Sequence, residues 1–289
     1  MRYPELIKAA EAAGGRLEYI GETRYGYPIP MISKGSERKG GVLIVGGVHA
    51  REYITARLLC ELTAAYSGDY PIDVAPSLNI DGAILSEHGL DEFALRMRER
   101  TRLVRINDGS TDFTLWKANI AGVDINTNFD AGWGEGEFNL ALPAPAGYVG
   151  VRPFSEPETR AARDIMERED KDYALAVAYH AKGEEVYWGF RKDTRYKREA
   201  ARVARALGYK LKKTPRSAGG LKDYWTLTTG RLGLTIEVGN DAFPHPYPLS
   251  ELPALVRQHT GMFGLYAEIA EKLYTKDYAK KGKRKNSTE

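Results

Sequence analysis

Short, wholly apolar runs alternate along the chain with longer stretches in which apolar residues recur at helical spacing. Three runs have the length and composition of strands buried on both faces, and they cover residues 41–47 (GVLIVGG), 173–180 (YALAVAYH) and 233–239 (GLTIEVG). A fourth run, 185–190 (EVYWGF), predicts a further strand. Helical patterns occupy residues 4–15, 53–65, 155–167, 195–208 and 249–274. Strands that alternate with helices predict an α/β fold on a mostly parallel or mixed sheet.

The sequence predicts the bounds of two helices, and it predicts no secondary structure for one long segment. Residues 155–158 (SEPE) have the spacing of a capping box with proline in the first turn, which predicts a helix that opens at Ser155. Residues 249–274 are expected to form one long closing helix. Residues 98–152 are rich in glycine and asparagine, and long irregular segments of this kind are often functional.

The composition is that of an ordinary globular protein of 289 residues, with a net charge of +3 and with acids and bases interspersed. Such a mild and scattered charge argues against nucleic-acid or membrane-surface partners. Without repeats or linkers, we predict one domain over residues 1–275 and a flexible basic tail over 276–289. Binding of an anionic partner is a minor alternative role for that tail.

Cysteine usage and the N-terminus bear on the cellular compartment. The single cysteine, Cys60, lies in an apolar helical pattern, which favours a buried thiol in a reducing compartment. The first residues contain no apolar signal segment, and no apolar stretch is long enough to span a bilayer. We therefore predict a cytoplasmic protein without a membrane partner.

Side chains capable of chemistry stand where the three buried strands end. His49 and Glu52 follow the first run, and His180 ends the second. Glu237 is an acid inside the otherwise apolar third run. Ligands of open α/β sheets bind beyond the carboxyl ends of strands, so these groups can meet in one crevice. Two imidazoles and a carboxylate suit Zn²⁺ and leave one position for water, which predicts a single catalytic zinc held by His49, Glu52 and His180.

Glu237 is the expected general base, which takes a proton from the attacking water and returns it to the leaving amine. Simpler explanations stay open at this point. A lone H-x-x-E is a weak motif, and a histidine at a strand end is more often structural than a ligand. A buried carboxylate is costly unless it is paired, so Glu237 has either an active-site role or an ion-pair partner. His88, His245 and His259 lie in polar or loop contexts and are assigned no role.

Six motifs occur in a characteristic order: HAREY (49–53), NIDG (79–82), WKANIAGVDINTNF (116–129), PFSEPET (153–159), YHAKGEEVYW (179–188) and LTIEVG (234–239). Their order and spacing resemble the M14 family of zinc carboxypeptidases over about residues 20–270. The resemblance implies that His49, Glu52 and His180 bind zinc, that Glu237 is the general base and that Arg51 binds substrate. It also implies a single domain with an eight-stranded mixed sheet flanked by helices on both faces.

Three positions depart from the family pattern. Members that remove C-terminal residues usually read N-R-N-F where this chain has N-T-N-F at 126–129. The neutral Thr127 cannot replace an arginine that holds the terminal carboxylate of the substrate. Asn126 is retained and is expected to hydrogen-bond the substrate. The position of the usual substrate-binding tyrosine matches Pro215, and that of the oxyanion-stabilising arginine matches Lys117, whose ammonium can serve the same purpose.

These departures resemble one branch of the family, the γ-D-glutamyl-L-diamino acid endopeptidases, which cleave peptidoglycan stem peptides between γ-D-Glu and meso-diaminopimelate. The segments at 113–126 and 180–188 carry this likeness. The resemblance implies a peptide substrate, an anionic muropeptide, in the positive field of Arg51, Lys117, Lys182 and Arg191; for the last two, solvated surface charge is an equal alternative. An ordinary carboxypeptidase on L-peptides, a related zinc acylase and a non-catalytic wall-peptide-binding protein are the rival functions.

Overall fold

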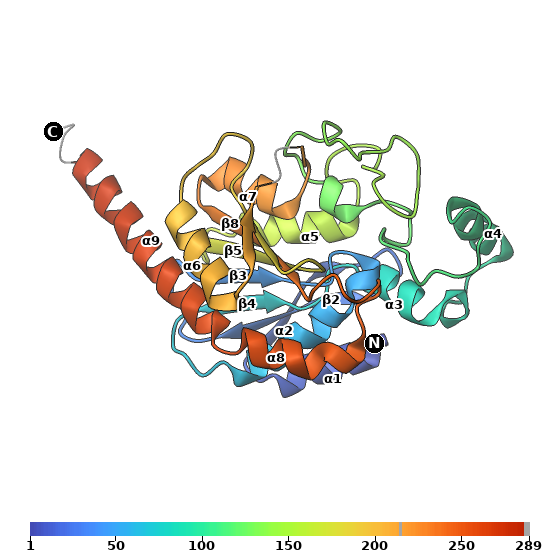
Figure 1. The fold of residues 1–289 in the computed structure, drawn as a ribbon, viewed down its shortest axis with the longest axis horizontal. Helices are drawn as coiled ribbons and strands as arrows, with labels where there is room; N and C mark the ends of the chain where they lie inside the picture. The colour runs from blue at the N-terminus through green and yellow to red at the C-terminus, as the bar shows by residue number, and fades with distance from the viewer. Residues whose placement is uncertain (214–215, 286–289) are drawn as a thin grey trace.

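The computed structural model describes the backbone of residues 1–213 and 216–285, and side chains within these ranges as far as residue 276. Its centre is an eight-stranded sheet with the strand order β1-β2-β4-β3-β5-β8-β6-β7 (Figure 1). The strands are β1 (Arg16–Glu22), β2 (Pro28–Lys34), β3 (Val42–Val45), β4 (Ile72–Ala75), β5 (Leu175–Ala181), β6 (Glu185–Trp188), β7 (Lys210–Lys212) and β8 (Leu232–Val238).

The sheet is mixed, as the sequence pattern predicts. Its central strands β4, β3, β5 and β8 are parallel to one another. β2 joins β4 and β1 joins β2 in antiparallel fashion on one side, while β6 is antiparallel to β8 and parallel to β7 on the other. Parallel central strands bring the residues that follow β3, β5 and β8 to one end of the sheet.

Helices cover both faces of the sheet. They are α1 (Tyr3–Ala12), α2 (Ile54–Ala65), α3 (Ile80–His88), α4 (Met97–Ile106), α5 (Pro157–Met166), α6 (Lys197–Leu207), α7 (Leu221–Thr229), α8 (Leu252–His259) and α9 (Met262–Lys285), with 3-10 turns η1 (Ala50–Glu52), η2 (Leu90–Glu92), η3 (Ile125–Thr127) and η4 (Leu249–Glu251). Apolar residues of α2, α6, α8 and α9 form one core with the sheet, and those of α3, α5 and α7 form the other. Figure 1 shows α5 and α7 above the sheet and α2 and α8 below it.

The continuous apolar runs arise from this double coverage. In β3, Val42 and Ile44 belong to one core, whereas Leu43 and Val45 belong to the other, and all four side chains are buried. A strand buried on both faces has no polar face, so its sequence does not alternate. Each such side chain contributes about 1.5–3 kcal/mol of burial free energy, which makes the central strands a firm support for the groups at their ends.

Two helix predictions are wrong in detail. The closing segment is not one helix: α8 ends at His259 and α9 begins at Met262, because the chain turns at Gly261 with a φ of +84°. A positive φ suits glycine and interrupts a right-handed helix. α9 then runs through Lys285, so residues 276–285 of the expected flexible tail belong to a helix, while 286–289 lie outside the described residues.

The N-terminus of α5 also differs from the capping-box prediction. The residue that precedes the helix is Glu156, not Ser155, and the Ser155 hydroxyl instead donates to the Glu156 carboxylate at 2.9 Å. That carboxylate is needed elsewhere, since it also accepts a bond from Asn119 at 2.8 Å. Tertiary contacts of Glu156 therefore outweigh the local cap.

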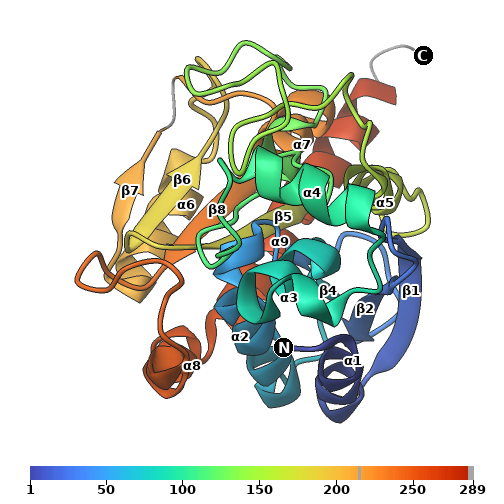
Figure 2. The ribbon, with the colours of Figure 1, turned by 90° about the vertical axis from the view of Figure 1, so that its right-hand side faces the viewer.

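The segment 107–156 lies over the end of the sheet at which β3, β5 and β8 finish. It consists mainly of turns and bends, with η3 and a bridge between Leu140 and Tyr148. Figure 2 looks onto this end of the molecule, with the segment drawn in green above the strand ends and α4 in front. The long irregular segment thus borders the region where site residues were predicted.

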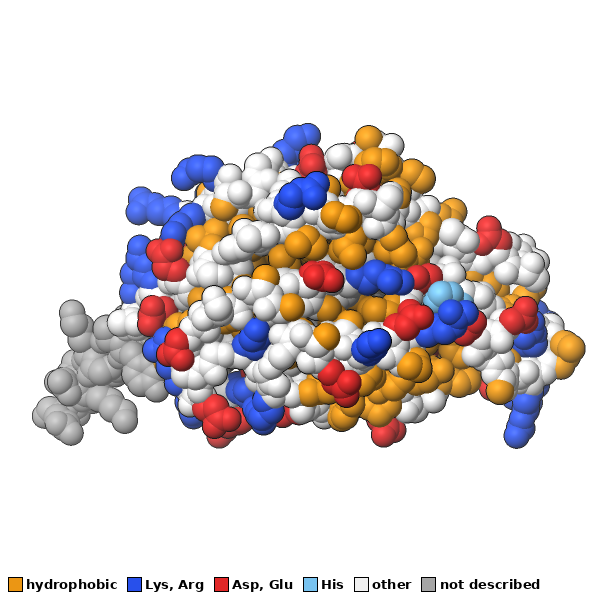
Figure 3. All heavy atoms as spheres, turned by 90° about the horizontal axis from the view of Figure 1, so that it is seen from below, with side chains coloured by type: hydrophobic (Ala, Val, Ile, Leu, Met, Phe, Trp, Pro, Cys, Tyr) orange, Lys and Arg blue, Asp and Glu red, His pale blue; other side chains and the backbone are white. Residues whose placement is uncertain are grey.

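The surface and the helices bear on the partner predictions. On the face seen in Figure 3, acidic and basic side chains are interspersed with hydrophobic ones. Among the residues that the structure describes, no helix combines the length and the apolar composition required to cross a bilayer. The cytoplasmic location stays a prediction.

Candidate metal centre and active site

The chain leaves β3 through two glycines and places His49 directly before η1. Gly47 has a φ of +53°, and a Cβ atom on it would lie 2.5 Å from the hydroxyl oxygen of Ser77. Only glycine fits this close approach without displacing the neighbouring chain. The short turn η1 then brings Glu52 back beside His49, so both side chains face the same point.

His180 and Glu237 reach the same region from neighbouring parallel strands. They are register partners in the pairing of β5 with β8, so their side chains stand side by side on one face of the sheet. This is the face covered by α5, α7 and the segment 107–156. Strand pairing thus fixes the spacing of the predicted third metal ligand and the predicted general base.

Three side chains converge on a single point. Nδ1 of His49 lies 2.8 Å from Oε1 of Glu52, and Nδ1 of His180 lies 3.0 Å from Oε2 of the same carboxylate. The two Nδ1 atoms are 3.1 Å apart. Suitable donor atoms of all three residues lie within 4.8 Å of one another, and the residues are buried.

This geometry fits a bound cation. Two imidazole nitrogens 3.1 Å apart face the same carboxylate, and a metal ion between them would use the lone pairs of all three groups. Burial disfavours the charged form of Glu52, but His49 and His180 hold the pKa of its carboxyl well below its usual value. The ionised carboxylate and two neutral imidazoles are a common donor set for catalytic Zn²⁺. The three predicted ligands are therefore brought together in a triad able to hold one metal ion.

An acidic residue outside the triad, Asp124, lies against His49 and was not predicted. Its Oδ1 lies 3.3 Å from Nε2 of His49, on the ring edge opposite the Nδ1 that faces Glu52. Its Oδ2 accepts a bond from the Lys117 ammonium at 2.7 Å. Burial opposes ionisation, but Lys117 and His49 hold the pKa of Asp124 well below its usual value. A carboxylate in this place orients a metal-binding imidazole and raises its basicity.

Glu237 stands next to the triad with its side chain only partly buried. Burial is the largest influence on it and raises the pKa of its carboxyl to about 8, although His180 and Lys117 act in the opposite direction. A divalent cation in the adjacent triad would favour the ionised form and lower this pKa. The arrangement offers a carboxylate that is not needed as a ligand, beside a site for an ion.

A family model described as zinc carboxypeptidase matches residues 5–259, which is most of the chain. The chain belongs to the M14 zinc carboxypeptidase family. The family prediction from the six motifs is therefore confirmed. With the His49, Glu52 and His180 triad in place, the chain is an M14 zinc metallopeptidase.

Two curated relatives resemble this M14 peptidase over much of its length. Gamma-D-glutamyl-L-diamino acid endopeptidase 1 of Lysinibacillus sphaericus is 28% identical over 272 residues, which cover 86% of this chain and 66% of the relative. The uncharacterized protein YqgT of Bacillus subtilis is 28% identical over 254 residues, covering 79% and 66%. The chain thus spans about two thirds of the length of these relatives.

Solved structures confirm the predicted carboxypeptidase fold. Thrombin-activatable fibrinolysis inhibitor superposes with a TM-score of 0.72 at 20% identity, over 94% of this chain and 72% of the other. The murein-tripeptide amidase MpaA of Escherichia coli O157 superposes with a TM-score of 0.54 at 23% identity, over 86% and 94%. The eight-stranded mixed sheet flanked by helices is therefore a carboxypeptidase-like fold.

The predicted substrate-binding residues of the M14 site lie in different settings. Asn126 accepts a bond from the backbone N–H of Leu221 at 3.1 Å, at the start of α7. Lys117 is held by Asp124. Arg51 donates to the Leu115 carbonyl at 3.4 Å, and its buried Nε has no hydrogen-bond partner among the described residues.

The remaining candidates from the sequence differ in exposure, and one lies outside the described residues. Lys182 pairs with Asp241 at 2.9 Å, and Arg191 pairs with Glu135. The Arg191 side chain is 53% exposed, which agrees with solvated surface charge, whereas that of Lys182 is only 14% exposed. Pro215, the match to the usual substrate-binding tyrosine, lies outside the described residues.

A pocket of about 550 Å³ begins beside the metal centre. We call it the site pocket; the residues that line it are Lys117, Asp124, Asn126, Thr127, 136–139, Ala146, Gly147, Tyr187, Lys212, Lys213 and 216–218. Asp124 and Lys117 connect it to His49, and the segment 107–156 supplies much of its wall. It is large enough for a small peptide substrate.

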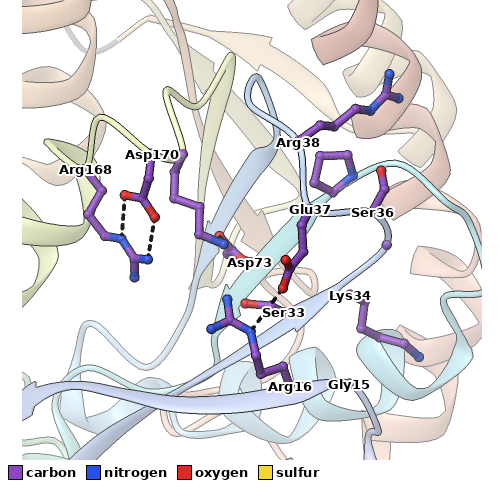
Figure 4. A pocket seen from close by; sticks show the side chains of 13 residues that line it. Gly15, Arg16, Ser33, Lys34, Ser36, Glu37, Arg38, Asp73, Arg168 and Asp170 are labelled. Atoms are coloured by element: carbon purple, nitrogen blue, oxygen red, sulfur yellow. Dashed lines mark hydrogen bonds and ion pairs between the residues drawn. The ribbon is translucent and has the colours of Figure 1, made fainter.

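Another pocket, of about 590 Å³, lies at the opposite, amino end of the parallel strands. Its wall includes the start of β1, the end of β2 and the residues before β5, and Figure 4 shows Arg168 paired with Asp170 and Arg16 with Glu37. Arg168 binds Asp170 at 2.7 Å, and Lys171 binds Asp73 at 2.8 Å. The predicted catalytic residues are therefore at the other end of the sheet from this pocket.

Proposed function

We propose that this M14 peptidase hydrolyses the amide bond between γ-D-glutamate and a diamino acid, as found in peptidoglycan stem peptides. The observation that carries the proposal is Thr127 in the wall of the site pocket. Its hydroxyl donates to the backbone carbonyl of Asp124 at 2.8 Å, and it has no charge to offer a terminal carboxylate. A site built for C-terminal L-residues would place an arginine fork there.

The similarity to an endopeptidase named for this bond supports the substrate class. So does the likeness in fold to a murein-tripeptide amidase, although that likeness by itself concerns only the fold. In a γ-D-glutamyl amide the acyl group is a side-chain carboxyl, so both partners of the bond carry additional charged groups. Recognition can then be spread over several contacts, and no single carboxylate clamp is required.

The residues present define roles for the hydrolysis itself. We assign His49, Glu52 and His180 as the ligands of Zn²⁺, which when bound supplies Lewis-acid polarisation of the carbonyl and activates water. Glu237 accepts a proton from the attacking water and delivers it to the nitrogen of the leaving diamino acid. Asp124 keeps the His49 ring in the tautomer that leaves Nδ1 free, because its Oδ1 faces the Nε2–H.

Two cations are candidates for the negative charge that develops on the substrate carbonyl oxygen. Lys117 and Arg51 both border the site, and a nearby positive donor stabilises such an oxyanion. Lys117 already neutralises Asp124, whereas the Nε of Arg51 is buried without a partner among the described residues. We therefore assign the oxyanion contact to Arg51 and the support of Asp124 to Lys117, with Asn126 contacting the substrate.

The test compares substrates on the purified, zinc-loaded protein. L-Ala-γ-D-Glu-meso-diaminopimelate and a blocked L-peptide with a free C-terminus are incubated in parallel, and the products are read by mass spectrometry. The proposal expects release of free diaminopimelate from the first and little change in the second. Release of the C-terminal residue from the L-peptide alone would assign an ordinary carboxypeptidase instead, and release of only an N-terminal acyl group would assign an acylase.

A further inference from the structure

Charged side chains continue across the sheet from the metal centre toward its β7 edge. Glu237 of β8 is the register partner of Glu185 in β6, and Tyr187 of β6 is the register partner of Lys212 in β7. Register partners point to the same face of a sheet, so Glu185, Tyr187 and Lys212 extend the face that carries Glu237. Two strand spacings separate β8 from β7, which is about 10 Å.

Tyr187 and Lys212 line the far end of the site pocket together with Glu137 and Arg216, so both signs of charge are present there. Lys212 pairs with Glu185, whose carboxylate also accepts the Tyr187 hydroxyl. Arg216 pairs with Glu137 at 2.6 Å. Such a wall offers an opposite charge to each end of a zwitterion, whereas a plain anion or a plain cation would meet a like charge at every second group.

The cations of these two ion pairs are open to solvent. The Arg216 side chain is 74% exposed and that of Lys212 is 47% exposed, although the Glu185 carboxylate that pairs with Lys212 is only 13% exposed. An exposed ion pair such as Arg216–Glu137 stabilises a fold by only about 0–1 kcal/mol. Lys213 is different, because its ammonium is held by the backbone carbonyl of Asp193 and lies 4.8 Å from the centre of the Trp188 ring. Lys212 and Arg216 are thus the cations of this wall that are available to a ligand.

On the basis of the proposed function, we propose that this end of the site pocket recognises the free, zwitterionic end of the diamino acid on the leaving side of the scissile amide. Lys212 and Arg216 bind its carboxylate, and Glu137 binds its ammonium. The distance from Glu237 to β7 suits a diaminopimelate chain that extends from its acylated nitrogen. A lysine in the same place has the ammonium but lacks the distal carboxylate, so it forfeits the contacts with Lys212 and Arg216.

The experiment uses three tripeptides of the form L-Ala-γ-D-Glu-X, in which X is meso-diaminopimelate, its derivative amidated at the distal carboxyl, or L-lysine. The zinc-loaded protein is expected to show a kcat/KM for the free acid about 10- to 100-fold above those of the other two. In a Lys212→Met, Arg216→Met double variant, the value for the free acid falls to the level of the lysine peptide. Hydrolysis of the lysine peptide stays within about twofold of the unmodified protein, and this shows that the variant is folded and catalytically intact.

A matched control removes the same charges elsewhere. Lys8 and Arg98 are exposed, and the Lys8→Met, Arg98→Met double variant should keep the full preference for the free acid. Equal rates on all three peptides in the unmodified protein, or an equal loss on all three in the pocket variant, would overturn the recognition of the zwitterion and leave the proposed function standing. If no γ-D-glutamyl peptide is cleaved while an L-peptide is, the proposed function itself fails.

Discussion

At the carboxyl end of the central sheet, His49, Glu52 and His180 turn donor atoms toward one another, whereas at the amino end most cations of the pocket meet a carboxylate. Lys171 lies 2.8 Å from Asp73, and Arg168 lies 2.9 Å from Glu18. Both ends have a pocket of similar volume, 590 and 550 Å³. Volume therefore does not distinguish a site of chemistry from a feature of the surface.

The state of the charges is what separates the two ends. In the amino-end pocket, local ion pairs already neutralise the groups, as Figure 4 shows for Arg168 and Asp170. At the metal centre, two imidazole nitrogens 3.1 Å apart share one buried carboxylate, Glu52, and the donor atoms of all three groups point to one position. Buried donor atoms that converge in this way indicate a ligand. Four experiments test whether the chemistry belongs to the carboxyl end alone.

Removal of the metal should abolish hydrolysis. A chelator takes away the Lewis acid, and the buried donors of the triad are left uncompensated. Zinc at about 100 times its Kd should also stabilise the fold by about 2.7 kcal/mol, which thermal unfolding with and without zinc measures. Full activity after exhaustive chelation, or an unchanged melting temperature on adding zinc, would contradict the assignment of the carboxyl end as a metal centre.

Substitution of the general base should leave the metal in place. Glu237→Gln keeps the size of the side chain but removes the proton acceptor, so kcat should fall by about 100- to 10,000-fold. Elemental analysis should still find one zinc per chain. Glu61→Gln on the exposed face of α2 is the control and should retain full activity. An active Glu237→Gln protein would mean that another group moves the proton.

The support of His49 by Asp124 predicts a smaller effect, on metal affinity. Asp124→Asn removes the negative charge that lies 3.3 Å from Nε2 of His49 and 2.7 Å from the Lys117 ammonium. Loss of such a partner typically weakens metal binding by about 10- to 100-fold. Competition with a chromogenic chelator measures the zinc affinity. An unchanged zinc affinity would mean that Asp124 lines the pocket without supporting His49 as a ligand.

The smallest effect is expected from a substitution in the amino-end pocket. Arg168→Gln breaks pairs with Asp170 and Glu18 that are partly exposed, so the free energy of unfolding should fall by no more than about 1 kcal/mol. Hydrolysis should be unaffected, since the pocket lies at the other end of the strands. A large loss of activity in this variant would mean that the amino end also takes part in the reaction.

The sequence revealed those site residues whose polarity differs sharply from that of their neighbours in the chain. Glu237 was noticed because it is a carboxylate in an apolar strand, and His180 because it ends one. β3, β5 and β8 were recognisable because both of their faces are buried. The same signal was present at Asp124, an acid between Val123 and Ile125, but it stood in a segment without periodicity. Its partners His49 and Lys117 come to it only through the tertiary fold.

β4 and β1, which the sequence did not predict, lack a continuous apolar run or a regular alternation. β4 is a short strand, Ile72–Ala75, whose apolar run is broken by Asp73. That carboxylate is buried because Lys171 and the Tyr173 hydroxyl reach it from a distant part of the chain, and no local pattern reveals such partners. β1 has no regular alternation of buried and exposed positions, so period-two analysis could not find it. Long-range compensation of polar groups is what single-sequence reasoning lacks.

The pairing of His180 with Glu237 across β5 and β8 has a consequence for how mutations can affect this enzyme. If β8 slipped by one residue, Glu237 would turn to the opposite side of the sheet, where Ile236 and Val238 now pack against the other core. Such a slip would expose those aliphatic side chains to the polar crevice, so the packing of the hydrophobic core holds Glu237 in register with His180. Substitutions in the loops around the crevice leave this register intact, whereas substitutions of Ile236 or Val238 act on it directly.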